Sequence, residues 1–473
     1  MLIMGEKMKM LGKNNVNKIT ILNIISTFML QGIAFITTPI FTRLLGTAQF
    51  GLYSLFNSWV LILTCLMGFG INSSIGTGVY TFKEHYISFR NSILVSSTLI
   101  CLLEIVVIVM CSSILVRVTG FSFDLVIIIG ITAFAHYIIN FAQMAFTYEK
   151  KAESNFILSV FLSIVSVGVS IFFIYKADSD SKYLGRIYGV AITYFIVAVI
   201  VWLVLFLKKA IGINKKYLQY GIAVGFPIVF HSLSQQILGQ SDRVMMQEFE
   251  ISTAEIGIYS LFYTLSSVLS TILGALNNSW CPFYYDDVSE EKWDTLNKKC
   301  KNYIEIFTIL CVGFLLLARE VSYIMADESY WRGINILPIL SLAVYFTFMY
   351  QFPVNFEFFH KKTKIIAIGT IGAGIVNIIL NAFMIPVLGM YGAAIATALS
   401  YFVLFLAHYA IVTRIKEYPY HLKITIFIPG IFGILIGIVL FYVLSPYSYV
   451  RWMIGIILGC FELYRIYKRK SIF

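Results

Sequence analysis

The chain is poor in charged residues and in proline, and it has no long polar stretch. Only 12% of its 473 residues are charged, whereas 59% are hydrophobic. The charged share is about half that of an ordinary soluble domain. Nine prolines leave no room for a proline-rich linker, and neither a Gly/Ser tether nor an acidic tail is present. One soluble core cannot bury so many apolar residues, so the sequence predicts an integral membrane protein.

The motifs of common enzymes are also missing. The seven cysteines are odd in number and show no CxxC spacing, so we expect neither a disulfide framework nor a metal site. There is no GxxxxGK phosphate loop, no HExxH and no paired acidic motif. The longest loop, near 284–301, is a solvated run of mixed charge without a visible nucleophile. We therefore expect that the chain is not an enzyme, that it uses no cofactor and that it is not a pump driven by ATP.

The net charge of +11 comes from small basic clusters between apolar runs rather than from one basic face. Nucleic acid is therefore not an expected partner, and the lipid bilayer explains these clusters better. The N-terminal stretch MLIMGEKMKMLGKNN has no apolar region ahead of a cleavage site, so it does not resemble a signal peptide.

Fourteen apolar segments are long enough to cross a bilayer core of about 30 Å as helices. They lie near 19–42, 50–76, 91–116, 123–147, 155–175, 186–207, 219–241, 256–283, 302–325, 334–358, 364–385, 389–412, 424–444 and 450–466. With the N-terminus in the cytoplasm, 26 of the 35 Lys and Arg residues fall on the inner side, as the positive-inside rule requires. We therefore predict an all-α, multi-pass protein with both termini in the cytoplasm.

A repeat organises these helices. TAQFGLYSLF at 47–56 returns as TAEIGIYSLF at 253–262, and YGVAIT at 188–193 returns as YGAAIA at 391–396. The offsets of 206 and 203 residues span six helices, an even number, so the two copies are expected to enter the membrane in the same direction. The sequence predicts two parallel six-helix bundles, 1–214 and 215–414, followed by two extra helices in 415–473.

Ionisable residues at membrane depth are costly and are the first candidates for function. Glu104 lies in the middle of an apolar helix and is an ion-coupling candidate, because a buried carboxylate could carry a proton. The alternative is a carboxylate bonded to a neighbouring helix. Glu357, at the inner end of the tenth segment, is expected at the membrane interface.

Arginines end the first helix of each bundle. Arg43 ends the first helix of the chain, and Arg243, beside Asp242, ends the seventh. An arginine from each bundle could grip a substrate phosphate in a central cleft, with Asp242 holding one of them in place. The alternative is that both arginines extend to the outer interface of the bilayer.

The same two helices contain proline and hydrogen-bonding side chains. Pro39 and Pro227 are expected to kink them and are the hinge candidates. Gln31 and Gln235 near these bends are candidates for binding the substrate headgroup. His231 is a second ion-coupling candidate, although a lone histidine can equally be a packing residue.

The two extra helices each contain a GxxxG pattern, formed by Gly433 with Gly437 and by Gly455 with Gly459. Such patterns let helix backbones approach closely. They predict either a lipid-facing hairpin or dimer contact, or ordinary helix packing.

Three stretches resemble the polysaccharide transporter family, the Wzx-type flippases of O-antigen and capsule repeat units. They are residues 17–55, which contain TRLLGTAQFGLYSL, residues 225–261, which contain GQSDRVMMQ, and residues 385–403, which contain MYGAAIA. The wider superfamily also holds the MATE drug exporters and the lipid II flippases. The resemblance therefore implies a V-shaped pair of six-helix bundles, with residues 415–473 matching two extra helices of the flippase branch. Arg43, Asp242 and Arg243 match recurrent family positions.

The resemblance implies a flippase that moves undecaprenyl-pyrophosphate-linked oligosaccharide across the bacterial plasma membrane. Its expected partners are this polyprenyl-linked substrate, a polysaccharide polymerase and a chain-length regulator. One alternative is a MATE-like, cation-coupled drug exporter. Another is a membrane-embedded polymerase or acyltransferase, for which the internal duplication is unexpected.

Overall fold

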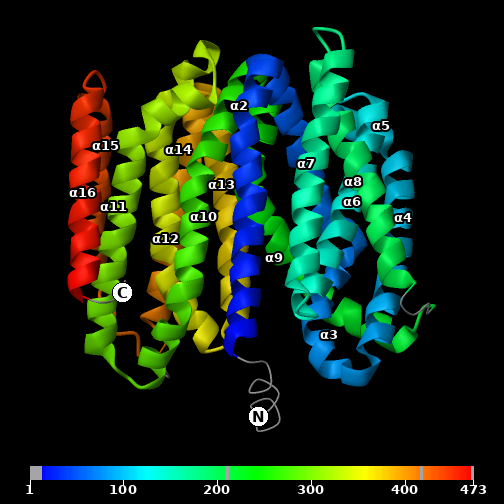
Figure 1. Cartoon of the computed structure of the whole chain (residues 1–473), viewed down its shortest axis with the longest axis horizontal. Helices are drawn as coiled ribbons and strands as arrows, with labels where there is room; N and C mark the ends of the chain where they lie inside the picture. The colour runs from blue at the N-terminus through cyan, green and yellow to red at the C-terminus, as the bar shows by residue number, and fades with distance from the viewer. Residues whose placement is uncertain (1–12, 208–211, 416–418, 470–473) are drawn as a thin grey trace. The chain divides into compact units, whose positions relative to one another are not determined.

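The computed structural model of the chain describes residues 13–207, 212–415 and 419–469, with side chains from residue 32 onward except that of residue 34. Helices make up its regular structure throughout this part of the chain (Figure 1). In a bilayer, backbone N–H and C=O groups must be satisfied within the segment, which a helix does. The prediction of an all-α, multi-pass membrane protein is therefore confirmed.

The fourteen predicted segments all lie in helical parts of the chain, although 50–76 and 91–116 are each divided between more than one helix. Ten stretches of the described chain are long and apolar enough to cross a membrane by themselves. The first of them, Phe35–Met110, contains parts of three predicted segments, and the ten do not include α11 or α16. The longer helices are α2 (Lys13–Leu66), α4 (Tyr86–Met110), α6 (Phe123–Tyr148), α7 (Ala152–Lys176), α8 (Lys182–Phe206), α9 (Lys215–Glu248), α10 (Thr253–Ser289), α11 (Trp293–Met325), α12 (Leu337–Phe359), α13 (Thr363–Leu388), α14 (Met390–Val412), α15 (Ile428–Val443) and α16 (Ser448–Arg469).

Short helices connect these long ones. They are η1 (Met67–Ser73), α3 (Ser74–Phe82), η2 (Lys83–His85), α5 (Ser112–Thr119), η3 (Glu328–Ile336) and η4 (Ile424–Phe427). The predicted second segment, 50–76, does not continue as one α-helix. Gly68, Phe69 and Gly70 have φ of 61°, 49° and 64°, so η1 turns the chain between α2 and α3.

The chain packs into two compact units. Unit 1 contains Met1–Leu45 and Leu52–Gln240, and unit 2 contains Gly46–Gly51 and Ser241–Phe473. Residues 215–240, which the repeat assigns to the second bundle, thus pack in unit 1. Small residues allow this, because a Cβ on Gly225 of α9 would lie 2.5 Å from the Gly70 carbonyl oxygen of η1.

The helices of each unit pack in a similar order. In unit 1, α8 packs against α6 and α7; in unit 2, α14 packs against α12 and α13. The second repeated phrase lies at these contacts. A Cβ on Gly189 would lie 2.3 Å from Ser170 Cα, and one on Gly392 would lie 2.2 Å from the Met384 carbonyl oxygen. The repeated glycines therefore sit where helix backbones touch.

The first repeated phrase also lies at a close contact, within unit 2. A Cβ on Gly51 would lie 1.9 Å from the Thr253 carbonyl oxygen, and a Cβ on Gly257 would lie 2.0 Å from the Thr47 carbonyl oxygen. The two copies thus contact each other reciprocally, each glycine against the threonine backbone of the other. Just before the first copy, Gly46 has φ 66° and ψ 176° and interrupts α2.

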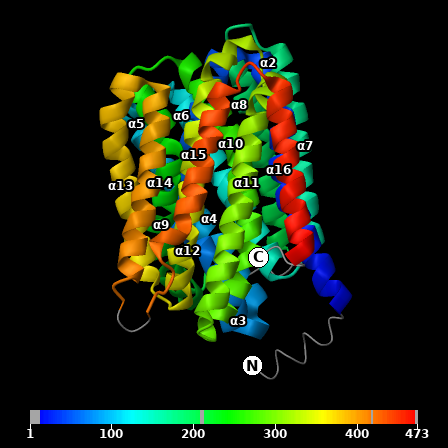
Figure 2. The same cartoon turned by 90° about the vertical axis from the view of Figure 1, so that its left-hand side faces the viewer.

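Helix α11 lies between the two C-terminal helices (Figure 2). Gly433 and Gly437 of α15 pack on α11, since a Cβ at these positions would lie 2.6 Å from Thr308 Cγ2 and 2.8 Å from Val312 Cγ2. In α16, a Cβ on Gly455 would lie 3.9 Å from Leu316 Cδ1, and one on Gly459 would meet nothing within 4 Å. The glycines of α15 therefore pack inside the unit.

Candidate functional site

Unit 1 holds a cavity of about 400 Å³ between η1, α6 and the first half of α9. Its polar side chains are all uncharged and consist of amides and hydroxyls. They are Thr64, Asn72, Ser73, Asn140, Gln143, Thr147 and Ser232. Met67, Met144, Ile228 and Val229 supply apolar surface. Neutral amides and hydroxyls over apolar surface can hydrogen-bond a polar, uncharged ligand such as a sugar.

Glu104 of α4 supports one wall of this cavity. Its carboxylate accepts a hydrogen bond of 2.9 Å from the Gly68 backbone N–H in the left-handed turn of η1. Gly68 cannot be replaced easily, because a Cβ there would lie 2.6 Å from the Tyr137 ring. Glu104 therefore has a structural contact with a neighbouring element, and its role in proton coupling stays a prediction.

Unit 2 contains a fully buried carboxylate, Asp242 of α9. It accepts hydrogen bonds of 2.8 Å from Asn381 Nδ2 of α13 and from Thr397 Oγ1 of α14, and a further one from the Tyr259 hydroxyl of α10. Asn377 extends the network, because its Oδ1 accepts from Ser241 Oγ at 2.7 Å and from Asn381 Nδ2 at 3.1 Å. We call these residues the Asp242 cluster.

The Asp242 cluster is not fully satisfied. Asn381 Oδ1 and Asn377 Nδ2 are buried and have no hydrogen-bond partner among the residues that the structure describes. The cluster thus presents a carboxylate, an unused carboxamide oxygen and three hydroxyls within the membrane-spanning helices. Such an oxygen donor set suits a proton or a small hard cation.

Arg243 is buried beside Asp242 and has partners of its own. Its Nε donates to Ser260 Oγ at 2.9 Å, and its guanidinium lies 4.4 Å from the Tyr263 ring centroid and 5.6 Å from that of Tyr259. The side chain is only 5% exposed. Arg243 is therefore held in unit 2 by aromatic stacking and hydrogen bonding.

Arg43 has a different environment, in unit 1. It is exposed, and its Nη1 donates to the Pro39 carbonyl oxygen at 3.1 Å. On the repeat offset of 206 residues, Arg243 aligns with Thr37 rather than with Arg43. The two arginines therefore occupy different positions in the repeat, and joint phosphate binding stays a prediction.

The other candidates from the sequence lie on α2 and α9. Gln235 is exposed and His231 is half-buried. Pro39 and Pro227 lie inside the two helices, but the non-helical dihedral angles recorded in α2 are those of Gly46. The side chain of Gln31 lies outside the described residues. The binding, coupling and hinge roles of these residues stay predictions.

One acidic residue has a buried partner that the sequence did not reveal. Glu357, expected at the membrane interface, is fully buried in unit 2, where its Oε2 lies 2.7 Å from Nδ1 of the equally buried His408. Asn377, Asn381, Tyr259 and Thr397 were also absent from the predicted site. The signal for the two asparagines was their spacing, because residues four apart share a helix face and both interrupt an apolar run.

The family described as polysaccharide biosynthesis protein matches residues 16–284, more than half of the chain. An uncharacterized membrane protein of Haemophilus influenzae is 24% identical over 46% of this chain and 54% of its own length. One of Methanocaldococcus jannaschii is 22% identical over 65% of this chain and 61% of its own length. The chain thus spans less than two thirds of either relative.

Two solved structures have the same fold. The lipid II flippase MurJ in an inward closed conformation matches with a TM-score of 0.71 and 17% identity, over 95% of this chain and 99% of that one. An inward-facing multidrug resistance MATE transporter matches with a TM-score of 0.59 and 16% identity, over 88% of this chain and 95% of that one. At this identity the likeness shows the fold alone.

Proposed function

Because the chain belongs to the polysaccharide biosynthesis protein family, we propose that it is a flippase for polyprenyl-linked oligosaccharides. The substrate class is an undecaprenyl-pyrophosphate-linked repeat unit, moved across the bacterial plasma membrane for O-antigen or capsule synthesis. The observation that carries this proposal is the cavity of unit 1, whose polar side chains are all neutral hydrogen-bonding groups. The likeness in fold to a lipid II flippase supports the same substrate class.

The physical task explains why such a cavity is useful. Moving a sugar headgroup from water into the bilayer without new hydrogen-bond partners costs several kcal/mol of free energy for each polar group. Amides and hydroxyls within the membrane-spanning helices can replace that water, while the polyprenyl tail stays in lipid. Alternating exposure of the cavity to the two sides would complete the transfer.

Transport against a gradient needs an energy source, and we assign coupling to the Asp242 cluster. Asp242 is a titratable carboxyl group within the spanning helices, and its contacts join α9 to α10, α13 and α14. Binding a proton or a small cation there would change the charge at the junction of four helices. Such a change can shift the balance between two conformations.

The function is tested in a bacterial strain that lacks its own repeat-unit flippase. Expression of this chain should restore surface polysaccharide when the repeat unit of the strain is accepted. The double variant Asn72→Ala/Asn140→Ala removes two amides of the cavity and should weaken substrate binding about thirtyfold and reduce rescue accordingly, because each lost hydrogen bond weakens binding by about 1 kcal/mol. The measurement is surface polysaccharide relative to the amount of protein in the membrane.

The matched control is Gln219→Ala, which removes an exposed amide of α9 that does not line the cavity. Its rescue should equal that of the unmodified chain. Correctly inserted protein that fails to rescue strains with several different repeat units would overturn the proposal. A change in drug sensitivity with normal polysaccharide would favour a drug exporter instead.

A further inference from the structure

Unit 2 has a second, larger cavity that the proposed flippase activity does not use. It is a groove of about 920 Å³ between α11 on one side and the segment 421–430 on the other, which leads into α15. We call it the α11–α15 groove. Both walls belong to unit 2, and α11 packs directly along α15.

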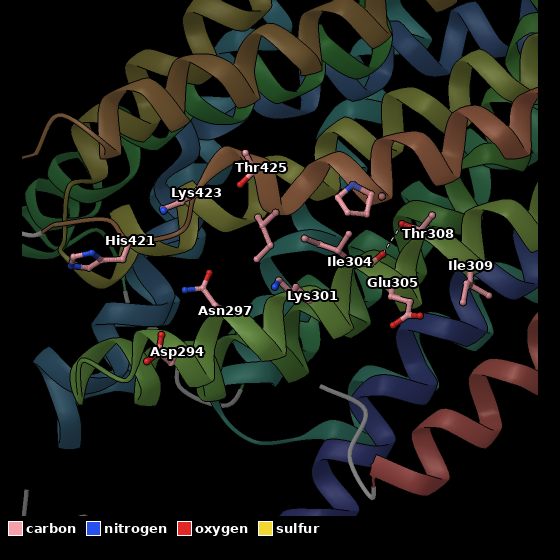
Figure 3. A pocket seen from close by; sticks show the side chains of 13 residues that line it. Asp294, Asn297, Lys301, Ile304, Glu305, Thr308, Ile309, His421, Lys423 and Thr425 are labelled. Carbon is pink, nitrogen blue, oxygen red and sulfur yellow. Dashed lines mark hydrogen bonds between the residues drawn. The ribbon is translucent and has the colours of Figure 1, made fainter.

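The groove is polar at one end and mainly apolar at the other, where Thr308 and Glu305 lie beside the apolar residues (Figure 3). Figure 3 shows Asp294, Asn297, His421 and Lys423 at one end, with Thr308 and Ile309 at the other. The walls near the apolar end also include Ile426, Pro429 and Gly430. Along α11, eight residues separate Lys301 from Ile309, which is about 12 Å at 1.5 Å per residue. A membrane lipid has the same order of groups over a similar depth, from headgroup to acyl chain.

The polar end carries unpaired positive charge. Lys301 on α11 and Lys423 on the opposite wall are both exposed, and neither forms an ion pair with a residue that the structure describes. His421 and Asn297 add hydrogen-bond donors, and Asp294 is the carboxylate at this end. An anion placed between the two lysines would therefore be attracted from both walls.

The second carboxylate of the groove is already neutralised. Glu305 forms ion pairs with Arg465 and, at 3.3 Å, with Arg469 of α16. It therefore repels an anion in the groove much less than a free carboxylate would. The remaining formal charge of the lining is positive, from the two lysines against Asp294.

The two walls pack closely at the apolar end of the groove. Gly430 lies against α11 and α12, and a Cβ there would lie 2.1 Å from the Tyr345 hydroxyl and 2.6 Å from Ile304 Cγ2. The Tyr345 hydroxyl is held in turn by Thr308 Oγ1 at 2.8 Å. The groove is thus a preformed feature of the packing of α15 on α11.

We propose that the α11–α15 groove binds an anionic phospholipid of the surrounding bilayer. Lys301 and Lys423 hold its phosphate from opposite walls, with Asn297 and His421 as hydrogen-bond donors. One acyl chain lies along Ile304, Ile309 and Pro429. The bound lipid fills the space between α11 and the start of α15.

The proposal is tested by measuring bound lipid on the full-length protein. Purified protein in detergent is mixed with phosphatidylglycerol or with phosphatidylcholine, and bound lipids are counted by native mass spectrometry. We expect phosphatidylglycerol to be retained preferentially. The variant Lys301→Gln/Lys423→Gln should lower its apparent affinity by roughly tenfold or more, because each lysine near an anionic headgroup strengthens binding about fivefold.

The matched control is Lys298→Gln/Lys364→Gln, which removes two exposed lysines of α11 and α13 that do not line the groove. It should bind phosphatidylglycerol like the unmodified chain. Equal loss in both double variants, or equal binding of phosphatidylcholine, would overturn the proposal. So would tighter retention at these lysines of a polyprenyl pyrophosphate than of phosphatidylglycerol, or displacement of the lipid by inorganic phosphate. Binding is measured without transport, so its failure is distinct from failure of the flippase assay.

Discussion

At the residue scale, Asp242 offers the sharpest test of coupling. Asp242→Asn keeps the size of the side chain but removes its charge. An amide nitrogen would then face donor groups, because the carboxylate accepts from Tyr259, Asn381 and Thr397. We expect transport in proteoliposomes to fall tenfold or more, and the residual transport no longer to depend on a sodium or proton gradient. If the substitution only disturbed the packing around this buried side chain, the transport rate would fall but would still depend on the gradient.

The control for this substitution is Asp180→Asn, which removes an exposed carboxylate between α7 and α8. It should leave both the rate and its gradient dependence unchanged. Coupling through Asp242 would be disproved by an Asp242→Asn protein with the gradient dependence of the unmodified chain. Fluorescence-detected gel filtration of both variants shows whether the fold is intact.

The repeat identified the helix that carries Asp242 but not the partners of this residue. Asn381 and Thr397 reach it across 139 and 155 positions of the chain. A single sequence contains no measure of such long-range pairing, so local patterns, hydropathy and spacing could not predict it. Local patterns also pointed to Arg243 as a site residue. They did not predict its burial, which depends on the rings of Tyr259 and Tyr263 in α10, 16 and 20 residues further along the chain.

At the scale of elements, the reciprocal glycine contact within unit 2 can be tested directly. Gly51→Ala would place a methyl group 1.9 Å from the Thr253 carbonyl oxygen, and Gly257→Ala would place one 2.0 Å from that of Thr47. These atoms are backbone and cannot rotate away, so the helices must separate. We expect each substitution to destabilise the protein by about 1–3 kcal/mol, as overpacking typically does. Thermal denaturation in detergent measures the loss.

Gly274→Ala is the matched control, because Gly274 lies in the same helix as Gly257 and a Cβ there would meet nothing within 4 Å. Its melting temperature should stay the same or rise slightly, since alanine favours a helix over glycine. Unchanged melting of both Gly51→Ala and Gly257→Ala would show that the contact is loose.

Hydropathy predicted where helices lie better than how they bend. All fourteen apolar segments lie in helical parts of the chain because length and apolar character decide membrane insertion, yet 50–76 and 91–116 are each divided between more than one helix. The left-handed turn at Gly68, Phe69 and Gly70 was not predicted, since these residues are as apolar as the helix around them. The interruption of α2 at Gly46 was not predicted either, although glycine is the residue that adopts a positive φ at least cost.

At the scale of the whole molecule, the fold class and the protein family could be predicted from the sequence. Apolar composition and the internal repeat were enough to predict a helical membrane protein built from two similar halves, because both features extend along the whole chain. The packing of residues 215–240 in unit 1 was beyond this reasoning. It depends on side chains of α9 meeting those of α3, such as the Tyr220 hydroxyl, which donates to Thr77 Oγ1 at 2.9 Å.

The orientation in the membrane is the last property that the sequence predicts. With 26 of 35 basic residues on one side, residues 284–301 and 359–364 should face the cytoplasm and residues 177–181 and 326–328 should face outward. In a variant without native cysteines, Lys298→Cys should react with a membrane-impermeant thiol reagent only after the cells are opened. Asp180→Cys and Asp327→Cys should react in intact cells. The reverse pattern would invert the topology. Labelling of all three in intact cells would contradict both the three crossings predicted between residues 180 and 298 and the single crossing predicted between residues 298 and 327.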